Sequence, residues 1–197
     1  GKVTHYNVDA RGSRSCPGYE ERAVKVATYG DSFTFGRQVN DDQTWQHRLS
    51  ELTDSLVLNF GVGNYGFDQG LLRFIKEHPK NPAPVTIMGV VPETIVRIHS
   101  SWKHYSEYGN IFGFKPRFEL RDGCLKYIEN PIKSRQHLHA FETHLQHFRR
   151  TDYWYKNKFL KDILRPPYSY HLLRSWNRNG PLISELARGD RNAAWAR

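Results

Sequence analysis

The sequence predicts an α/β protein built around a parallel sheet, and two observations lead to that prediction. Three short runs at 24–29, 55–60 and 85–91 are rich in apolar and β-branched residues, as buried strands are. The segments between the runs are long enough for a crossover helix and carry apolar residues at helical spacing. Because such crossovers join parallel strands, we expect a three-layer α/β/α sandwich on a parallel sheet.

The first half of the chain has recognisable element boundaries. Residues 1–22 are polar and contain turn-forming glycine and proline, which predicts an irregular lead-in. Thr44 is placed to cap the first helix, and Pro79 to end the second. The apolar positions of these helices are Trp45, Leu49 and Leu52 in the first, and Leu71, Phe74, Ile75 and His78 in the second.

The alternation of strands and helices stops after the third strand. Asp122-Gly123 lies between two strand-like segments at 115–119 and 125–129, which predicts a β-hairpin. Helical stretches are expected near 135–150, 156–164 and 168–177. We expect a single domain over 1–197, with the lead-in at 1–22, the α/β core at 23–98, and a hairpin and basic helical insertion at 99–180.

Composition excludes several classes of protein. A chain with 38% hydrophobic and 14% aromatic residues is globular rather than disordered. No apolar stretch approaches the ~18 residues of a membrane span, and the absence of a leader pattern leaves the compartment open. Cys16 and Cys124 are too few for a disulfide framework or a four-cysteine zinc site.

The formal net charge of +9 is concentrated in one part of the chain. Between Lys133 and Arg178 ten basic residues stand against three acidic ones, so this segment alone carries +7. Aromatic residues interleave with the basic ones. This pattern suits binding to an anionic glycan, another polyanion or an anionic membrane surface, and it also suits a solvated helical face with aromatic anchors. The aromatic residues are Tyr153, Trp154, Tyr155, Tyr168, Tyr170 and Trp176.

Four histidines cluster in the same basic segment, and they allow two interpretations. His137, His139, His144 and His147 lie in a polar, helical stretch, where 144 and 147 share a face but 139 does not. Glu142 is the one carboxylate among them at ligand spacing. The cluster is therefore either a metal site or a solvated histidine-rich helix.

The segment most informative about function follows the first strand directly. Gly30-Asp31-Ser32 stands at the carboxyl end of that strand, where α/β sheets place their chemistry. A glycine turn at this point can present the Ser32 hydroxyl as a nucleophile. The alternative is that Ser32 or Thr34 caps the next helix.

A glycine-rich loop follows the second strand, and it also has two interpretations. Gly61, Gly63 and Gly66 have the spacing of a dinucleotide-binding loop. However, that loop belongs to the first strand–helix turn of such folds, and no strand that ends in an acidic residue lies about twenty residues further on. Alternatively, backbone N–H groups of this loop converge on the serine turn and form an oxyanion hole.

Taken together, the two loops resemble the SGNH, or GDSL-type, hydrolase family. Gly30-Asp31-Ser32 matches the nucleophile block of that family, and residues 59–69 look like its second block. The resemblance extends from about residue 5 to residue 130 and implies a flavodoxin-like sandwich. It implies that Ser32 attacks an ester carbonyl, that the N–H groups of Ser32 and Asn64 form the oxyanion hole, and that no metal or organic cofactor is needed. Gly30, Asp31 and Gly63 would shape the site.

The chain departs from the family pattern in two ways. Glu93 stands where the third block has a donating amide, so Thr94 or Arg97 would have to substitute. The family's Asp-x-x-His is missing, and the remaining candidates for the base are His99, His104 and His171. Three predicted strands, where the family has five, point to a domain that is incomplete at its carboxyl end.

These observations lead to two hypotheses from different classes. The first is a serine esterase or acyl transferase that acts on a small-molecule or carbohydrate ester, with an activity that the missing base leaves in doubt. The second is a non-catalytic module that binds an anionic glycan or other polyanion through its basic, aromatic insertion. Neither hypothesis involves nucleic acid, and the oligomeric state stays open.

Overall fold

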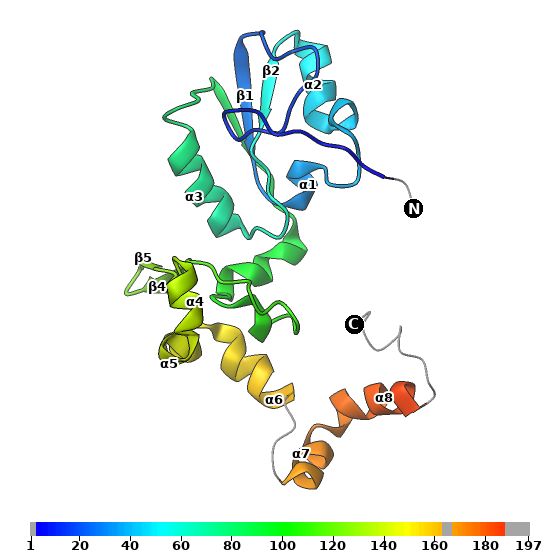
Figure 1. The fold of residues 1–197 in the computed structure, drawn as a ribbon, viewed down its shortest axis with the longest axis vertical. Helices are drawn as coiled ribbons and strands as arrows, with labels where there is room; N and C mark the ends of the chain where they lie inside the picture. Colours follow the sequence, from blue (N-terminus) through cyan, green and yellow to red (C-terminus); the bar gives the residue numbers. More distant parts are fainter. Residues whose placement is uncertain (1–2, 163–166, 188–197) are drawn as a thin grey trace. The chain divides into compact units, whose positions relative to one another are not determined.

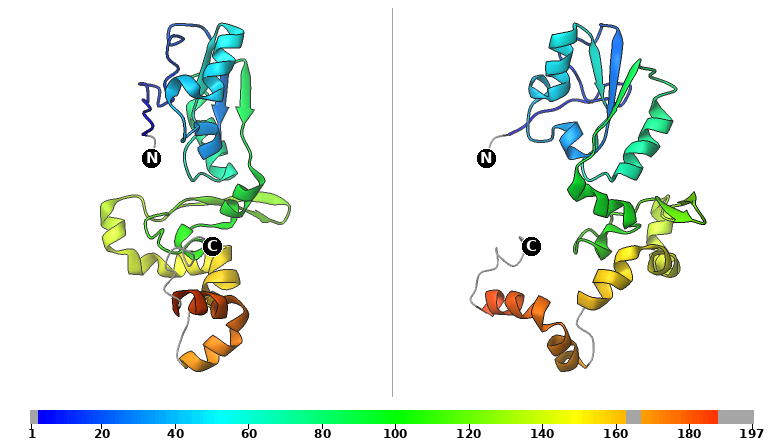
Figure 2. Two further views of the ribbon diagram at one scale, coloured as in Figure 1. Left: turned by 90° about the vertical axis from the view of Figure 1, so that its right-hand side faces the viewer. Right: turned by 180° about the vertical axis from the view of Figure 1, so that it is seen from behind.

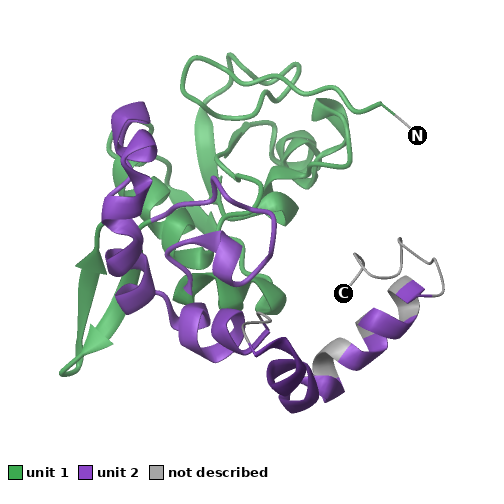
Figure 3. Ribbon diagram, turned by 60° about the horizontal axis from the view of Figure 1, so that its bottom comes forward, with its two compact units in different colours: residues 1–99, 116–129 green, residues 100–115, 130–197 purple. Residues whose placement is uncertain are grey.

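The computed structural model describes residues 3–162 and 167–187 (Figure 1). The chain divides into two compact units, drawn in two colours in Figure 3. The first contains Gly1–His99 and Pro116–Glu129, and the second contains Ser100–Lys115 and the chain from Asn130 onward. The core was expected to end at residue 98, and the first segment of this unit ends at His99; the hairpin, expected in the insertion, groups with the sheet.

The first unit is built on a three-stranded parallel sheet. The strands are β1 (Val24–Tyr29), β2 (Leu56–Asn59) and β3 (Val85–Met88), in the order β2-β1-β3. Helix α2 (Trp45–Thr53) connects β1 to β2, and α3 (Phe67–Glu77) connects β2 to β3. The two connections run in opposite directions along the sheet and place α2 and α3 on opposite sides of it (Figures 1 and 2). The prediction of an α/β fold with a parallel sheet is confirmed.

The centre of this sheet is apolar because β1 and β2 are covered on both faces. Ala27, Tyr29 and Phe60 are fully buried, and Leu58 is 1% exposed. The rings of Tyr29 and Phe60 stack with their centroids 5.2 Å apart. Continuous apolar runs of this kind are typical of strands buried between layers.

Helix α2 begins where the sequence predicts, but its buried face is not its apolar face. Thr44 caps the helix by accepting a hydrogen bond from the His47 amide. Leu52 is 84% exposed, whereas Gln46 is 1% exposed and Ser50 is fully buried. The polar residues can be buried because they are hydrogen-bonded: Gln46 Nε2 donates to the Thr34 carbonyl oxygen at 2.6 Å, and Ser50 Oγ accepts from the Val57 amide at 3.1 Å.

Strand β3 is shorter than predicted, and a 3₁₀ helix, η2 (Pro92–His99), follows it. The predicted hairpin then forms, as β4 (Arg117–Arg121) and β5 (Cys124–Ile128). Asp122 and Gly123 both have positive φ, at 52° and 76°, as a two-residue hairpin turn requires. The hairpin belongs to the first unit because β4 contacts η2 and α3.

The second unit is held together by a cluster of aromatic side chains. Trp102, Tyr105 and Phe148 are its buried centre. Buried Asp152 accepts hydrogen bonds from the amides of Ser101 and Trp102 at 2.6 and 2.9 Å and so ties two distant segments of this unit together. The helical elements of the unit are η3 (Lys103–Tyr105), α4 (Arg135–His139), α5 (Phe141–Thr151), the π-helical η4 (Tyr155–Phe159), α6 (Leu160–Asp162), α7 (Tyr168–Arg174) and α8 (Trp176–Ala187).

The three helical stretches expected in this half are present, except that residues 163 and 164 lie outside the described residues. Arg165 and the Arg178 side chain, two of the basic groups noted above, also lie outside them. Within the described part of the chain, no helix combines the length and the apolar character needed to cross a membrane.

Candidate active site

The serine turn lies at the carboxyl end of the central strand. β1 ends at Tyr29, and Ser32 is the first residue of α1 (Ser32–Phe35). Gly30 is required here because a Cβ atom at this position would lie 2.2 Å from Thr34 Oγ1 and 2.9 Å from the Gly89 carbonyl oxygen. The turn is therefore packed against the residue that follows β3, and the ends of β1 and β3 meet beside Ser32.

Asp31, rather than Ser32 or Thr34, caps α1. Its Oδ1 accepts a hydrogen bond from the Phe33 amide at 2.9 Å. The interpretation of Ser32 as a helix cap is therefore wrong. Ser32 is half-buried, and its hydroxyl makes no hydrogen bond to any residue in the described part of the chain. The hydroxyl is thus not committed to a structural role there.

The two loops that the sequence singled out lie in contact. The Val62 amide donates to the Gly30 carbonyl oxygen at 3.0 Å. A Cβ atom at Gly61 would lie 2.3 Å from the Phe35 nitrogen, so only glycine lets the second loop approach the first this closely. Asn64 has a φ of 67°, the left-handed conformation that asparagine tolerates well. Gly63, expected to shape the site, faces open space, and the close approach falls to Gly61 instead.

A pocket opens beside the serine. Its volume is about 460 Å³, and its lining comes from α1 and the loop that follows it. Phe33, which is 67% exposed, contributes an apolar part of the wall. The residues that line the pocket are Ser32, Phe33, Gly36, Arg37, Gln38 and Val39.

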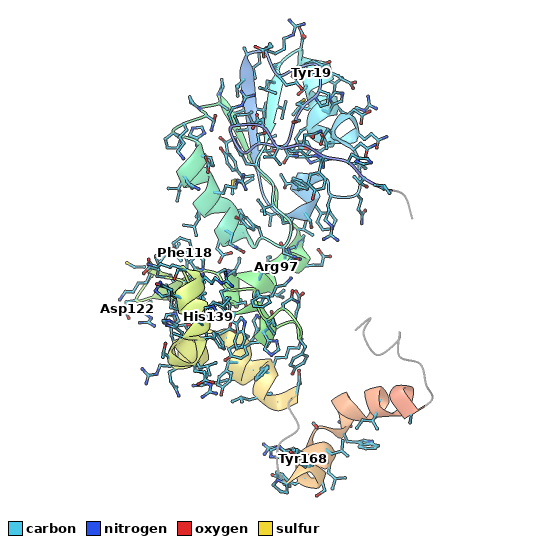
Figure 4. All side chains as sticks on the ribbon, viewed as in Figure 1. Tyr19, Arg97, Phe118, Asp122, His139 and Tyr168 are labelled. Atoms are coloured by element: carbon cyan, nitrogen blue, oxygen red, sulfur yellow. The ribbon has the colours of Figure 1, made fainter. Side chains whose placement is uncertain are left out.

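Arg97 approaches the serine turn from η2, where Figure 4 labels it. Its Nη1 donates to the Tyr65 carbonyl oxygen at 3.0 Å and lies 3.9 Å from Asp31 Oδ2. That carboxylate oxygen is buried, and no described residue forms a hydrogen bond with it. Arg97 is therefore the nearest charge to a buried carboxylate at the candidate site.

The other candidates from the third block are placed differently. Glu93 is exposed, and the Thr94 hydroxyl donates to the Val91 carbonyl oxygen at 2.8 Å, within its own turn. Of the two substitutes that the sequence suggested for the missing amide, Arg97 reaches the serine turn. The sequence could not predict where the Arg97 side chain lies, because the pattern of strands and helices did not indicate the 3₁₀ helix η2 that carries it.

The structure brings no general base to Ser32 within the described residues. His99 is exposed at the end of η2 in the first unit, and His104 and His171 belong to the second unit. Burial lowers the pKa of His104, whose ring packs among aromatic side chains. In residues 3–162 and 167–187, no imidazole and no carboxylate is hydrogen-bonded to the Ser32 hydroxyl.

A buried arginine from the lead-in fixes the loop that lines the pocket. The Arg14 side chain is fully buried, and its Nε donates to Asp41 Oδ1 at 2.7 Å. Its two terminal nitrogens donate to the carbonyl oxygens of Phe35, Gly36 and Val39 at 2.7, 2.8 and 2.6 Å. Sequence reasoning missed this residue because a polar stretch with glycine and proline looks exposed, and its partners lie 21 to 27 residues away.

The histidine-rich stretch spans α4 and α5. The rings of His137 and His144 are 5.7 Å apart. Among the described residues, no three histidine, cysteine, aspartate or glutamate side chains are arranged to hold a metal ion.

Neither a scan against models of protein families nor a search of curated proteins found a match to this chain.

Proposed function

We propose that the protein is a serine esterase or acyl transferase of the SGNH type, acting on acyl esters through Ser32. The observation that carries the proposal is the contact between the two motif loops at the carboxyl end of β1. The Val62 amide is hydrogen-bonded to the Gly30 carbonyl oxygen, and Ser32 lines a pocket of about 460 Å³ next to this junction. The three-layer sandwich of that family is part of the same proposal.

In the proposed reaction the Ser32 hydroxyl attacks the ester carbonyl and forms an acyl-enzyme, and the alcohol leaves. Water completes hydrolysis, and a second alcohol completes acyl transfer. The N–H groups of Ser32 and Asn64 donate to the oxyanion of each tetrahedral intermediate. Arg97 takes the place of the missing side-chain amide as a third donor, because a guanidinium has five N–H groups and two of its contacts are fixed near Ser32.

The attack by Ser32 requires a group that accepts its proton. No imidazole or carboxylate among the described residues is hydrogen-bonded to the Ser32 hydroxyl, and a serine without a base is a weak nucleophile. The proposal therefore includes a folded but catalytically incomplete form. Such a form should react with strongly electrophilic reagents and turn over ordinary esters poorly.

Labelling with a fluorophosphonate tests the proposal, because its phosphorus is a much stronger electrophile than an ester carbonyl and bonds covalently to a reactive serine. We expect the wild-type chain to be labelled on Ser32 and the Ser32→Ala variant not to be labelled. Ser169→Ala is the matched control, since Ser169 is an exposed serine on α7 and its loss should leave labelling unchanged. Hydrolysis of p-nitrophenyl acetate by the same three proteins provides the second readout. Equal behaviour of wild type and Ser32→Ala in both assays would overturn the proposal.

A second candidate function is binding of an anionic glycan or other polyanion by the second unit. It is favoured by four of the six aromatic side chains of the basic segment, which lie at the surface: Tyr153, Tyr168, Tyr170 and Trp176 are 49, 63, 54 and 52% exposed. Trp154 and Tyr155, by contrast, pack against the aromatic cluster. Retention on heparin that falls with salt and survives Ser32→Ala would support this function, and an absence of retention at low salt would exclude it.

A further inference from the structure

A second pocket adjoins the serine pocket in the first unit. Its volume is about 410 Å³, and the two pockets share Arg37 in their walls. Gly61, Val62 and Gly63 of the second motif loop form one wall, and Arg73 of α3 lines the pocket as well. A group bound in this second pocket would therefore lie next to a substrate held at Ser32.

This second pocket is lined by arginine and by no acidic residue. Arg14, Arg37 and Arg73 contribute to the lining, and the described residues that line the two pockets include no aspartate or glutamate. The charge of Arg14 is neutralised by its ion pair with Asp41. The charges of the other two arginines decide the electrostatics of the pocket.

Neither Arg37 nor Arg73 forms an ion pair with a residue that the structure describes. The Arg37 side chain is exposed and forms no ion pair or hydrogen bond there. Arg73 donates from Nη2 to the Gly12 carbonyl oxygen at 2.7 Å, which leaves its charge in place. Its Nε is buried without a hydrogen-bond partner among the described residues, which is costly in the absence of a ligand. Glu77, one turn further along α3, is paired with Lys76 and Lys80.

A guanidinium matches the oxygens of a carboxylate or phosphate in charge and in geometry. Two such groups in one recess, with no acid in the lining, attract an anionic ligand more strongly than the same groups on an open surface. An uncharged sugar or acyl chain would leave both charges unmatched. The chemistry of the pocket thus selects anionic oxygen groups.

We propose that Arg37 and Arg73 form a subsite for an anionic oxygen group, a carboxylate or a phosphate, carried by the ester substrate. The link between this subsite and catalysis rests on the proposed function of Ser32, whereas the binding of the anion does not. The preferred substrates are esters that carry a carboxylate or phosphate close to the scissile bond, in the acyl or the alcohol part. Simple neutral esters are poorer substrates.

Binding is tested without turnover, in the Ser32→Ala variant, by NMR titration of the backbone amides. Glutarate and glycerol 3-phosphate are expected to shift the signals of residues 61–63, and the uncharged analogues glutaramide and glycerol are not. The stronger of the two anions identifies carboxylate or phosphate as the natural group. Arg37→Gln and Arg73→Gln should each weaken binding about 10- to 100-fold, the range for a hydrogen bond to a charged group. Arg48→Gln is the matched control, an exposed arginine of α2, and should change affinity less than twofold.

Kinetics then separate the subsite from the proposed reaction. The ratio of kcat/KM for mono-p-nitrophenyl glutarate to that for p-nitrophenyl butyrate should fall in Arg37→Gln and be unchanged in Arg48→Gln. Anion binding without Ser32-dependent turnover would leave the subsite standing and overturn the esterase. Turnover without anion binding, or binding that both arginine variants retain, would overturn the subsite and leave the esterase standing.

Discussion

The buried Arg14 should be the most sensitive polar residue of the first unit, and replacing it with methionine tests this. Methionine keeps most of the apolar stem and removes every hydrogen bond of the guanidinium. Four acceptors lose the bond from Arg14: Asp41 Oδ1 and the carbonyl oxygens of Phe35, Gly36 and Val39. The Phe35 and Gly36 carbonyl oxygens each keep one other donor, from Asn59 and Val39. All four acceptors lie between the end of α1 and the start of the 3₁₀ helix η1 (Asp41–Gln43), and Gly36 and Val39 line the pocket beside Ser32.

The size of the effect follows from which groups stay buried after the change. Hydrogen bonds to a charged group contribute about 1.5–3 kcal/mol each, but four of them cannot simply be added, because the loop relaxes and water reaches some of the carbonyl groups. Breaking a buried ion pair by removing one partner costs about 3–5 kcal/mol, and the Arg14 side chain is fully buried. We therefore expect Arg14→Met to lower the free energy of unfolding by about 3–5 kcal/mol, a large part of the ~5–15 kcal/mol of a typical domain.

Urea unfolding followed by circular dichroism measures this loss, with Arg11→Met as the matched control. Arg11 lies in the same lead-in and pairs with Asp9, but its side chain is 34% exposed, so its loss should cost less than about 1 kcal/mol. The double variant Arg14→Met/Asp41→Asn should be less destabilised than the sum of its single changes, because each removes the other's partner. A loss below about 1 kcal/mol for Arg14→Met would refute the reasoning, as would strict additivity.

Two further predictions concern packing and pH. Gly61→Ala should lower the free energy of unfolding by about 1–3 kcal/mol, because the new Cβ atom would lie 2.3 Å from the Phe35 nitrogen. A Cβ atom at Gly63 meets open space, so Gly63→Ala should change the free energy of unfolding by less than about 0.5 kcal/mol in the same urea assay. A larger loss for Gly63→Ala than for Gly61→Ala would contradict this packing. Burial lowers the pKa of His104 in the folded protein below its ordinary 6.5. As the pH falls, the imidazole is therefore protonated in the unfolded chain before it is protonated in the folded one. The free energy of unfolding is unaffected by this group above pH ~6.5 and decreases as the pH falls from there toward the lowered pKa. His104→Phe should therefore flatten the decline of stability below pH ~6.5, by at most about 1.4 kcal/mol per pH unit, and equal slopes for the two proteins would contradict this role.

The parts of the fold that the sequence predicted well are those with local causes. β1 covers Val24–Tyr29, as its apolar run predicts, because a strand buried on both faces needs such a run. The Asp122-Gly123 turn forms because both residues accept positive φ. Thr44 caps α2 because its side chain reaches an amide three residues away. Each of these causes acts within a few residues of the chain.

The parts that the sequence did not predict depend on partners far away in the chain. The polar face of α2 is buried because Gln46 finds acceptors on Thr28 and Thr34, which a hydrophobic pattern cannot indicate. The lead-in is not a loose segment, since Arg14 pairs with a carboxylate 27 residues later. Charged residues are rarely buried, so pattern reasoning places them outside by default.

The candidate site combines both kinds of residue, and only its local turn could be located from the sequence. The Gly-Asp-Ser turn is a local motif, and its glycine and its cap are explained by contacts within the turn and with the end of β3. Arg14, Arg37 and Arg97 reach the same region from three separate segments, and no local pattern distinguishes them from surface arginines. A motif identifies a reactive group, but the rigidity of the turn and the charge around the substrate come from these long-range neighbours. If Ser32 is the nucleophile, substrate choice is therefore decided by the arginines rather than by the motif.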